Sequence, residues 1–128
     1  MRTSIERLKR RSDFLRVAAA KRRFTTPGLV LQVLPRPRNG DRAPLRVGFT
    51  VTKKVGKAVV RNRTRRRLRA AAAAVLPNHG PQGHDLVLIG RNTTNARPFG
   101  ALVGDLETAL HRLKVWRREP DEKVPDDR

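Results

Sequence analysis

A dense block of arginine in the middle of the chain limits how the surrounding segments can pack. Six of the nine residues from Arg61 to Arg69 are arginine, and five consecutive alanines follow at positions 70–74. At about 100° per residue, a helix through this segment gathers one narrow stripe of small and apolar residues. The stripe consists of Val60, Thr64, Leu68, Ala71 and Val75. We therefore predict a helix that packs along one side only and turns its arginines outward.

No acidic residue nearby offsets this charge. The chain carries 30 Lys and Arg against 11 Asp and Glu, a net charge of +19, and no acid occurs between Asp41 and Asp85. An ordinary solvated helix face would carry acids spaced to pair with its basic residues. Because like charges at this density destabilise a compact state, we expect a polyanion, and above all a nucleic acid, to bind here. A supercharged soluble surface or an anionic membrane binder is the less favoured alternative, and charge alone does not separate DNA from RNA.

Composition excludes several classes of protein. The chain has no cysteine, which rules out a disulfide framework and a thiolate metal site. No apolar run approaches the roughly 18–20 residues that span a bilayer. The N-terminal segment is basic but lacks the apolar stretch of a secretory signal. We expect a cytoplasmic protein.

Helices are expected near both ends of the chain. Ser12 or Asp13 is the candidate N-cap of a first helix, in which Phe14 and Val17 begin an apolar face. From Phe99 to Trp116 apolar residues recur every three to four positions, which predicts a long amphipathic helix. We interpret Phe99 and Trp116 as core residues.

Strands are expected at 29–34, 45–52 and 85–90. The run 85–90 does not alternate, which is typical of a strand buried on both faces. In 45–52, Leu45, Val47, Phe49 and Val51 alternate with Arg46, Gly48, Thr50 and Thr52. The second set is small and polar, and fits either a solvated surface or the floor of a groove. With two or three strands before the basic helix, the whole order, taken as αβββαβα, predicts an α+β domain in which 45–52 and 85–90 can pair in parallel.

Catalysis by the protein itself is not expected. His79, His84 and His111 lack metal-ligand spacing, and we interpret them as surface residues. A two-metal nuclease needs several converging carboxylates, whereas the acids here are scattered. No nucleophile elbow is present.

Three short motifs occur in a fixed order between Arg46 and Arg69. They are a strand of the form Arg-Val-Gly-Phe-x-Val, a Lys-Lys-x-Gly turn, and an Ala-Val-x-Arg-Asn-Arg helix start. This segment closely resembles the signature of the bacterial ribonuclease P protein subunit. RLKRRSDFLRV near the N-terminus, and DLVLIGR followed by a long helix, also match that family in position. The resemblance covers the chain from about Leu8 to Trp116.

The resemblance implies a fold and a function. The family fold is a small α/β sandwich whose basic helix forms a left-handed crossover between parallel strands, an exception to the usual hand. In the family an RNA subunit, with Mg²⁺, hydrolyses precursor tRNA to remove its 5′ leader. The protein binds that RNA and holds the leader. We therefore expect ribonuclease P RNA and precursor tRNA as partners, no DNA or membrane, and Mg²⁺ bound mainly by the RNA. Residues 1–118 would form the domain, and 119–128 a disordered charged tail.

Two groups of residues match the family's RNA-binding positions. The catalytic RNA would be bound by Lys53, Lys54, Arg61, Asn62, Arg63, Arg65, Arg66 and Arg69. The leader would lie in a cleft between the first helix and the open sheet face, at Phe14, Gln32, Thr50 and Thr52. Aromatic stacking and a basic groove together commonly hold single-stranded RNA.

Three positions depart from the family pattern. Ala18 and Gln32 stand where aromatic residues are common, so we expect weaker stacking on the leader. Lys57 stands where asparagine is common, so the basic helix loses an N-cap and gains an adverse charge near its positive dipole end. A phosphate bound there would offset that charge.

Two other functions remain open: a structured-RNA protein without a processing role, and a nuclease that acts alone.

Overall fold

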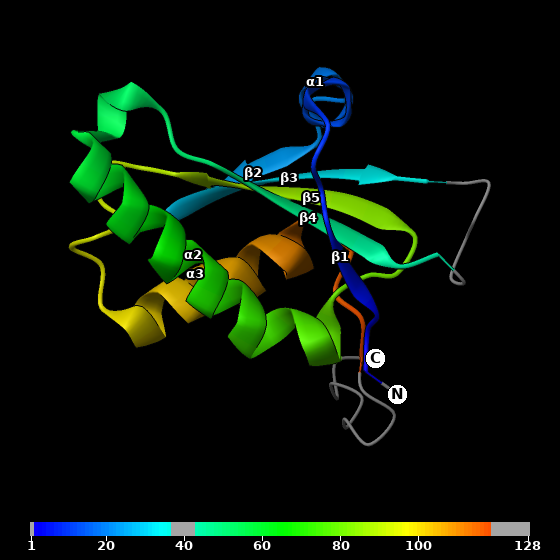
Figure 1. The fold of residues 1–128 in the computed structure, drawn as a ribbon. Coiled ribbons are helices and arrows are strands. Elements are labelled where there is room, and N and C mark those ends of the chain that lie inside the picture. The colour runs from blue at the N-terminus through cyan, green and yellow to red at the C-terminus, as the bar shows by residue number, and fades with distance from the viewer. Residues whose placement is uncertain (1, 37–42, 119–128) are drawn as a thin grey trace.

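The computed structural model describes residues 2–36 and 43–118, and the expected tail 119–128 lies outside them. Figure 1 shows its helices and strands, coloured in chain order. They are β1 (Ile5–Arg7), α1 (Arg11–Ala19), β2 (Arg23–Thr25), β3 (Leu29–Pro35), β4 (Leu45–Thr50), the 3-10 helix η2 (Lys53–Val55), α2 (Ala58–His79), β5 (His84–Gly90) and α3 (Phe99–Arg112). From α1 onward the order is αβββαβα, which confirms the predicted α+β class. A short strand, β1, precedes it.

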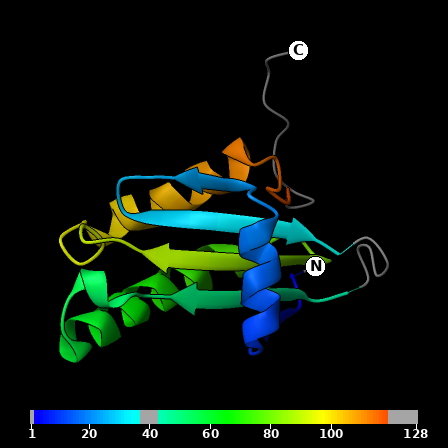
Figure 2. The ribbon, with the colours of Figure 1, turned by 90° about the horizontal axis from the view of Figure 1, so that it is seen from above.

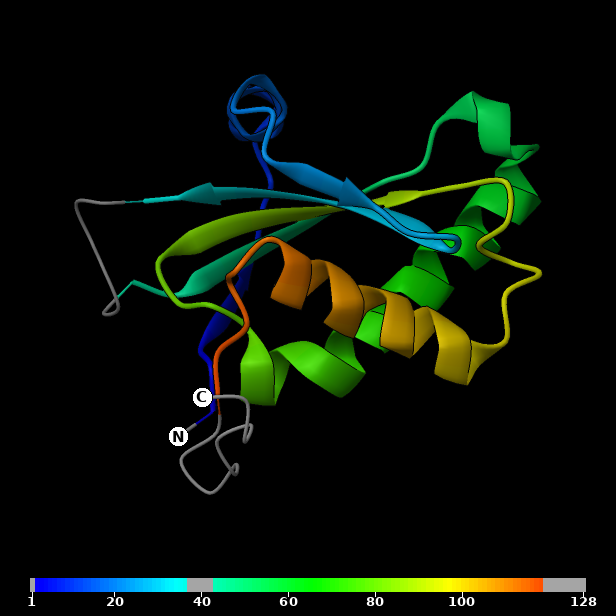
Figure 3. The ribbon, with the colours of Figure 1, turned by 180° about the vertical axis from the view of Figure 1, so that it is seen from behind.

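The strands form one mixed sheet with β5 near its middle. The order is β1-β4-β5-β3-β2, in which β1, β4 and β5 are parallel neighbours and β3 is antiparallel to β5. Helices α2 and α3 lie on one face and α1 crosses the other (Figures 1 and 3). The sheet is therefore the middle layer of a sandwich.

The connection from β4 to β5 has the hand that the resemblance implied. Figure 2 shows β4 and β5 pointing the same way, with α2 passing behind the sheet between them. With the strands upright and the helix behind, β5 lies to the right of β4, so the crossover is left-handed. Most βαβ units turn the other way.

The main core lies between the sheet and helices α2 and α3. Leucines from both layers are fully buried there, among them Leu31, Leu68, Leu88 and Leu106. A smaller cluster of Leu8, Val17 and Val87 fixes α1 to the opposite face. β5 contributes to both clusters, which confirms that this strand is buried on both faces.

Several local predictions were wrong. Helix α1 begins at Arg11 with Arg10 as its N-cap residue and no side-chain cap, so neither Ser12 nor Asp13 caps it. The helix predicted from Phe99 to Trp116 ends at Arg112, and the strand predicted for 45–52 ends at Thr50. Phe99 is 43% exposed, because it begins α3 at the surface, and is not a core residue.

Candidate nucleic-acid interface

Helix α2 has one packed side and one charged side, as its sequence pattern predicts. Its buried residues are Thr64, Leu68, Ala71, Ala72, Val75 and Leu76. Val60, which the pattern placed in this stripe, is 38% exposed and lies beside Gly56 in the turn before the helix. The packed side is therefore built mainly from the second half of α2, and the basic first half projects past the sheet.

The residues predicted to face the catalytic RNA lie in η2 and along α2 from Arg61 to Arg69. Lys53, Lys54, Asn62, Arg63, Arg66 and Arg69 are exposed, and Arg61 and Arg65 are half-buried. Val59, Asn62, Arg65, Arg66 and Arg69 line a shallow hollow along the outer side of α2. Within it the Arg65 guanidinium donates a hydrogen bond to Asn62 Oδ1 at 3.1 Å. This bond orients Arg65 across the face of the helix.

Arg67 belongs to the same block but has a structural role. Its guanidinium donates hydrogen bonds to the carbonyl oxygens of Thr94 and Arg97, in the loop that follows β5. Arg67 therefore ties that loop to α2, and its absence from the predicted RNA-binding set fits this placement.

The acids in the described body of the protein are mostly committed to other arginines. Asp85 is fully buried and accepts two hydrogen bonds from Arg46, at 2.8 and 2.6 Å. Asp13 lies 3.3 Å from Arg46 and 3.0 Å from Arg16, and so links α1 to β4. Arg97 pairs with Asp105 at 2.9 Å. The hydrogen bonds that Arg46 donates to the Asp85 carboxylate raise the pKa of Arg46 above its ordinary value, so Arg46 stays charged in the folded protein.

This ion-pair group explains why Asp13 is not a cap. The Asp13 carboxylate points toward the sheet, where Arg46 lies on the α1 face of β4. The pairing joins residues 33 positions apart, so local spacing could not reveal it. Among the described residues, none of these acids lines the hollow on the outer side of α2.

The residues predicted to hold the leader are only partly brought together. Phe14 and Thr50 line a hollow between α1 and the end of β4, together with Lys9, Arg11, Leu15, Phe49, Val51 and Arg65. Thr52 is exposed outside that hollow, and Gln32 is 8% exposed beneath α1, in register with Val87. Lys9, Arg11 and Leu15 were not predicted for this site, although the basic run before Phe14 is visible in the sequence.

Gly48 lets α1 approach the sheet. A Cβ built on Gly48 would lie 2.5 Å from two ring atoms of Phe14 and 3.2 Å from Leu8 Cβ. The Phe14 ring therefore rests directly on the backbone of β4. The small residue in this strand has a packing reason that only the position of α1 reveals.

Arg65 connects the two sites. It lines the hollow on the outer side of α2 and also the hollow that contains Phe14 and Thr50. The basic helix face and the space under α1 are therefore adjacent parts of one surface.

The histidines do not form a site. The rings of His79 and His111 both stack on Trp116, with centroid distances of 3.9 and 4.2 Å. Trp116 is half-buried and packs against the main core. The sequence predicted surface histidines, and the stacking of two of them on Trp116 is seen only in the structure. Among residues 2–36 and 43–118, no group of three His, Asp or Glu side chains could hold a metal ion. No helix in this part of the chain is long and apolar enough to cross a membrane.

Comparison with known proteins agrees with this architecture. The family profile described as Ribonuclease P matches residues 3–114. The ribonuclease P protein component of Gluconacetobacter diazotrophicus is 57% identical over 85% of this chain and 91% of its own length. That of Paramagnetospirillum magneticum is 49% identical over 98% of this chain and 96% of its own. The Thermotoga maritima RNase P protein structure matches with a TM-score of 0.65 and 25% identity, covering 84% of this chain and 96% of that one. The chain therefore belongs to the ribonuclease P protein family.

Proposed function

We propose that the chain acts in ribonuclease P by binding its catalytic RNA through the outer side of α2. The observation that carries the proposal is the set of exposed cations from Lys53 to Arg69, in a stretch of sequence that has no acid between Asp41 and Asp85. Arginine presents a planar fork of donors that fits phosphate oxygens. An RNA backbone supplies the negative charge that the protein lacks.

The hollow under α1 is the proposed site for the 5′ leader of precursor tRNA. The Phe14 ring offers a stacking surface, Thr50 a hydroxyl group, and Lys9, Arg11 and Arg65 positive charge. Gln32 is buried and does not line this hollow, so the proposal gives it no direct contact with the leader. Because Arg65 borders both hollows, a leader held here would lie beside the RNA bound to α2.

Within this proposal the protein binds and positions RNA, and the RNA carries the chemistry. Among the described residues, no group of three or more His, Asp or Glu side chains could hold a metal ion. We assign Mg²⁺ mainly to the RNA subunit. The protein's contribution is to hold the precursor and to reduce repulsion between the two RNAs.

Reconstitution tests this function. Purified protein alone is expected to leave precursor tRNA intact, and to restore 5′ maturation at low Mg²⁺ when ribonuclease P RNA is added. Cleavage by the protein alone would instead support a protein nuclease. Binding of the RNA without stimulation would support a structured-RNA protein that has no processing role.

A further inference from the structure

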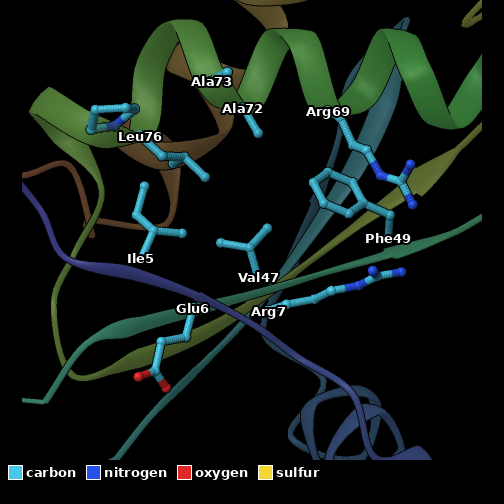
Figure 4. Close-up of a pocket in the computed structure, with 10 residues that line it drawn as sticks. Ile5, Glu6, Arg7, Val47, Phe49, Arg69, Ala72, Ala73 and Leu76 are labelled. Atoms are coloured by element: carbon cyan, nitrogen blue, oxygen red, sulfur yellow. The ribbon is translucent and has the colours of Figure 1, made fainter.

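A separate cavity opens beside the outer side of α2. It has a volume of about 430 Å³ and lies between the second half of α2 and the β1–β4 edge of the sheet (Figure 4). Its walls are Ile5, Val47, Phe49, Ala72, Ala73, Leu76 and Pro77, with Glu6, Arg7 and Arg69 at its margin. It is therefore an apolar space with charged groups at its mouth.

The two arginines lie at the same end of the cavity. Figure 4 shows the Arg7 and Arg69 guanidinium groups next to Phe49, with the Arg69 Cζ atom 5.8 Å from the ring centroid. Glu6 points away from α2, because alternation along β1 turns it to the Arg46 side of the sheet. The charge at this end is therefore positive.

The alanine run makes the cavity possible. Ala72 and Ala73 line it, so α2 presents methyl groups where longer side chains would fill the space. Pairing between β1 and β4 stops at Arg7 and Val47, which leaves Phe49 without a β1 residue beside it. The cavity is thus open at the end where Phe49, Arg7 and Arg69 meet.

The cavity is continuous with the proposed RNA-binding face. Arg69 lines both this cavity and the outer hollow that contains Asn62, Arg65 and Arg66. A phosphate bound by Arg69 would therefore stand at the mouth of an apolar space bordered by an aromatic ring. Such an arrangement suits a nucleotide, which joins a flat base to an anionic phosphate.

We propose that this cavity receives one unpaired base of the RNA bound along α2, with its phosphate held by Arg69 and Arg7. The base enters between Ala73 and Val47 and lies against the Phe49 ring. Stacking of a base on an aromatic side chain tolerates any base, because each has a π face. The proposal rests on the proposed function, and it makes the alanine run part of the RNA-binding surface.

The test fills the cavity without changing charge. Ala73 and Ala74 are both exposed, but only Ala73 lines the cavity. Ala73→Leu is expected to weaken binding of ribonuclease P RNA about tenfold, within the range of one lost base–aromatic stack. Ala74→Leu is the matched control and is expected to bind like the unaltered chain. The salt dependence of binding should be equal for all three, because no phosphate contact is removed.

Chemical probing of the RNA bases gives a second measurement. At least one unpaired base should be protected from a base-modifying reagent by the unaltered chain and by Ala74→Leu, and should stay reactive with Ala73→Leu. Equal affinity and equal protection for Ala73→Leu would overturn the base-binding proposal while leaving RNA binding by α2 intact. Failure of the unaltered chain to bind the RNA would overturn both. Arg7→Ala should make the slope of log affinity against log salt shallower by about 0.7–0.9, as expected for one lost phosphate contact.

Discussion

Gly48→Ala tests whether α1 rests on the sheet as closely as the structure shows. The new methyl carbon would lie 2.5 Å from Phe14 Cε1 and Cζ, whereas carbon atoms favour separations of about 3.5–4.0 Å. Phe14 or the whole of α1 must therefore move by about 1 Å. Overpacking of this kind costs about 1–3 kcal/mol. Gly→Ala substitution also lowers the entropy of the unfolded chain, which stabilises the folded state by about 0.4–1 kcal/mol.

The net effect is a loss of about 1–2 kcal/mol, which corresponds to a fall in Tm of roughly 3–10 °C for a domain of this size. Thermal unfolding followed by circular dichroism measures it. Gly104→Ala is the matched control: it lies within α3 with nothing within 4 Å of the new methyl group, so the Tm should stay level or rise. Adding Phe14→Leu to Gly48→Ala should recover part of the loss. An unchanged Tm for Gly48→Ala would refute the close packing of α1 on β4.

Three further substitutions separate structural from RNA-binding roles. Phe14→Ala should weaken binding of leader-bearing precursor more than binding of mature tRNA in the reconstituted enzyme, and equal losses would show that Phe14 serves packing alone. Arg67→Ala should lower the free energy of unfolding by about 1–2 kcal/mol, because two hydrogen bonds to the loop carbonyls of Thr94 and Arg97 are lost. The control Arg66→Ala should leave the free energy of unfolding unchanged. Urea unfolding of both variants measures the difference. Arg46→Leu should destabilise the fold by about 3 kcal/mol, because it leaves fully buried Asp85 without its bidentate partner; a change below 1 kcal/mol would show that Arg36, 3.2 Å from Asp85, suffices.

Strong local periodicity allowed much of the fold to be predicted. β4 alternates, β5 is continuously apolar from Leu86 to Ile89, and α2 carries a single packed stripe, so each pattern allowed one main interpretation. β1 has only three residues and is held by pairing with β4, so nothing in its own sequence marks it as a strand. The side chain of Asp13 looked like a cap because its partner Arg46 is distant in sequence.

The candidate site, like the fold, was only partly predictable from the sequence. The arginines of α2 are visible as a charge pattern, but only the structure separates Arg65, Arg66 and Arg69, which line the outer hollow, from Arg67, which is bonded to the loop after β5. The space under α1 depends on Phe14 meeting Gly48, a contact between separate elements that no periodicity encodes. The cavity beside Ala73 requires both the position of β1 and the left-handed path of α2.

The salt dependence of binding to ribonuclease P RNA tests the central claim that α2 binds the RNA backbone. With about six phosphates neutralised, the slope of log affinity against log salt should lie near −4 to −5. Replacing both Arg65 and Arg66 by alanine should make it shallower by about 1.4–1.8, since each contact contributes about 0.7–0.9. A slope that is the same in the double variant and the unaltered chain would contradict the assignment of this helix face to RNA.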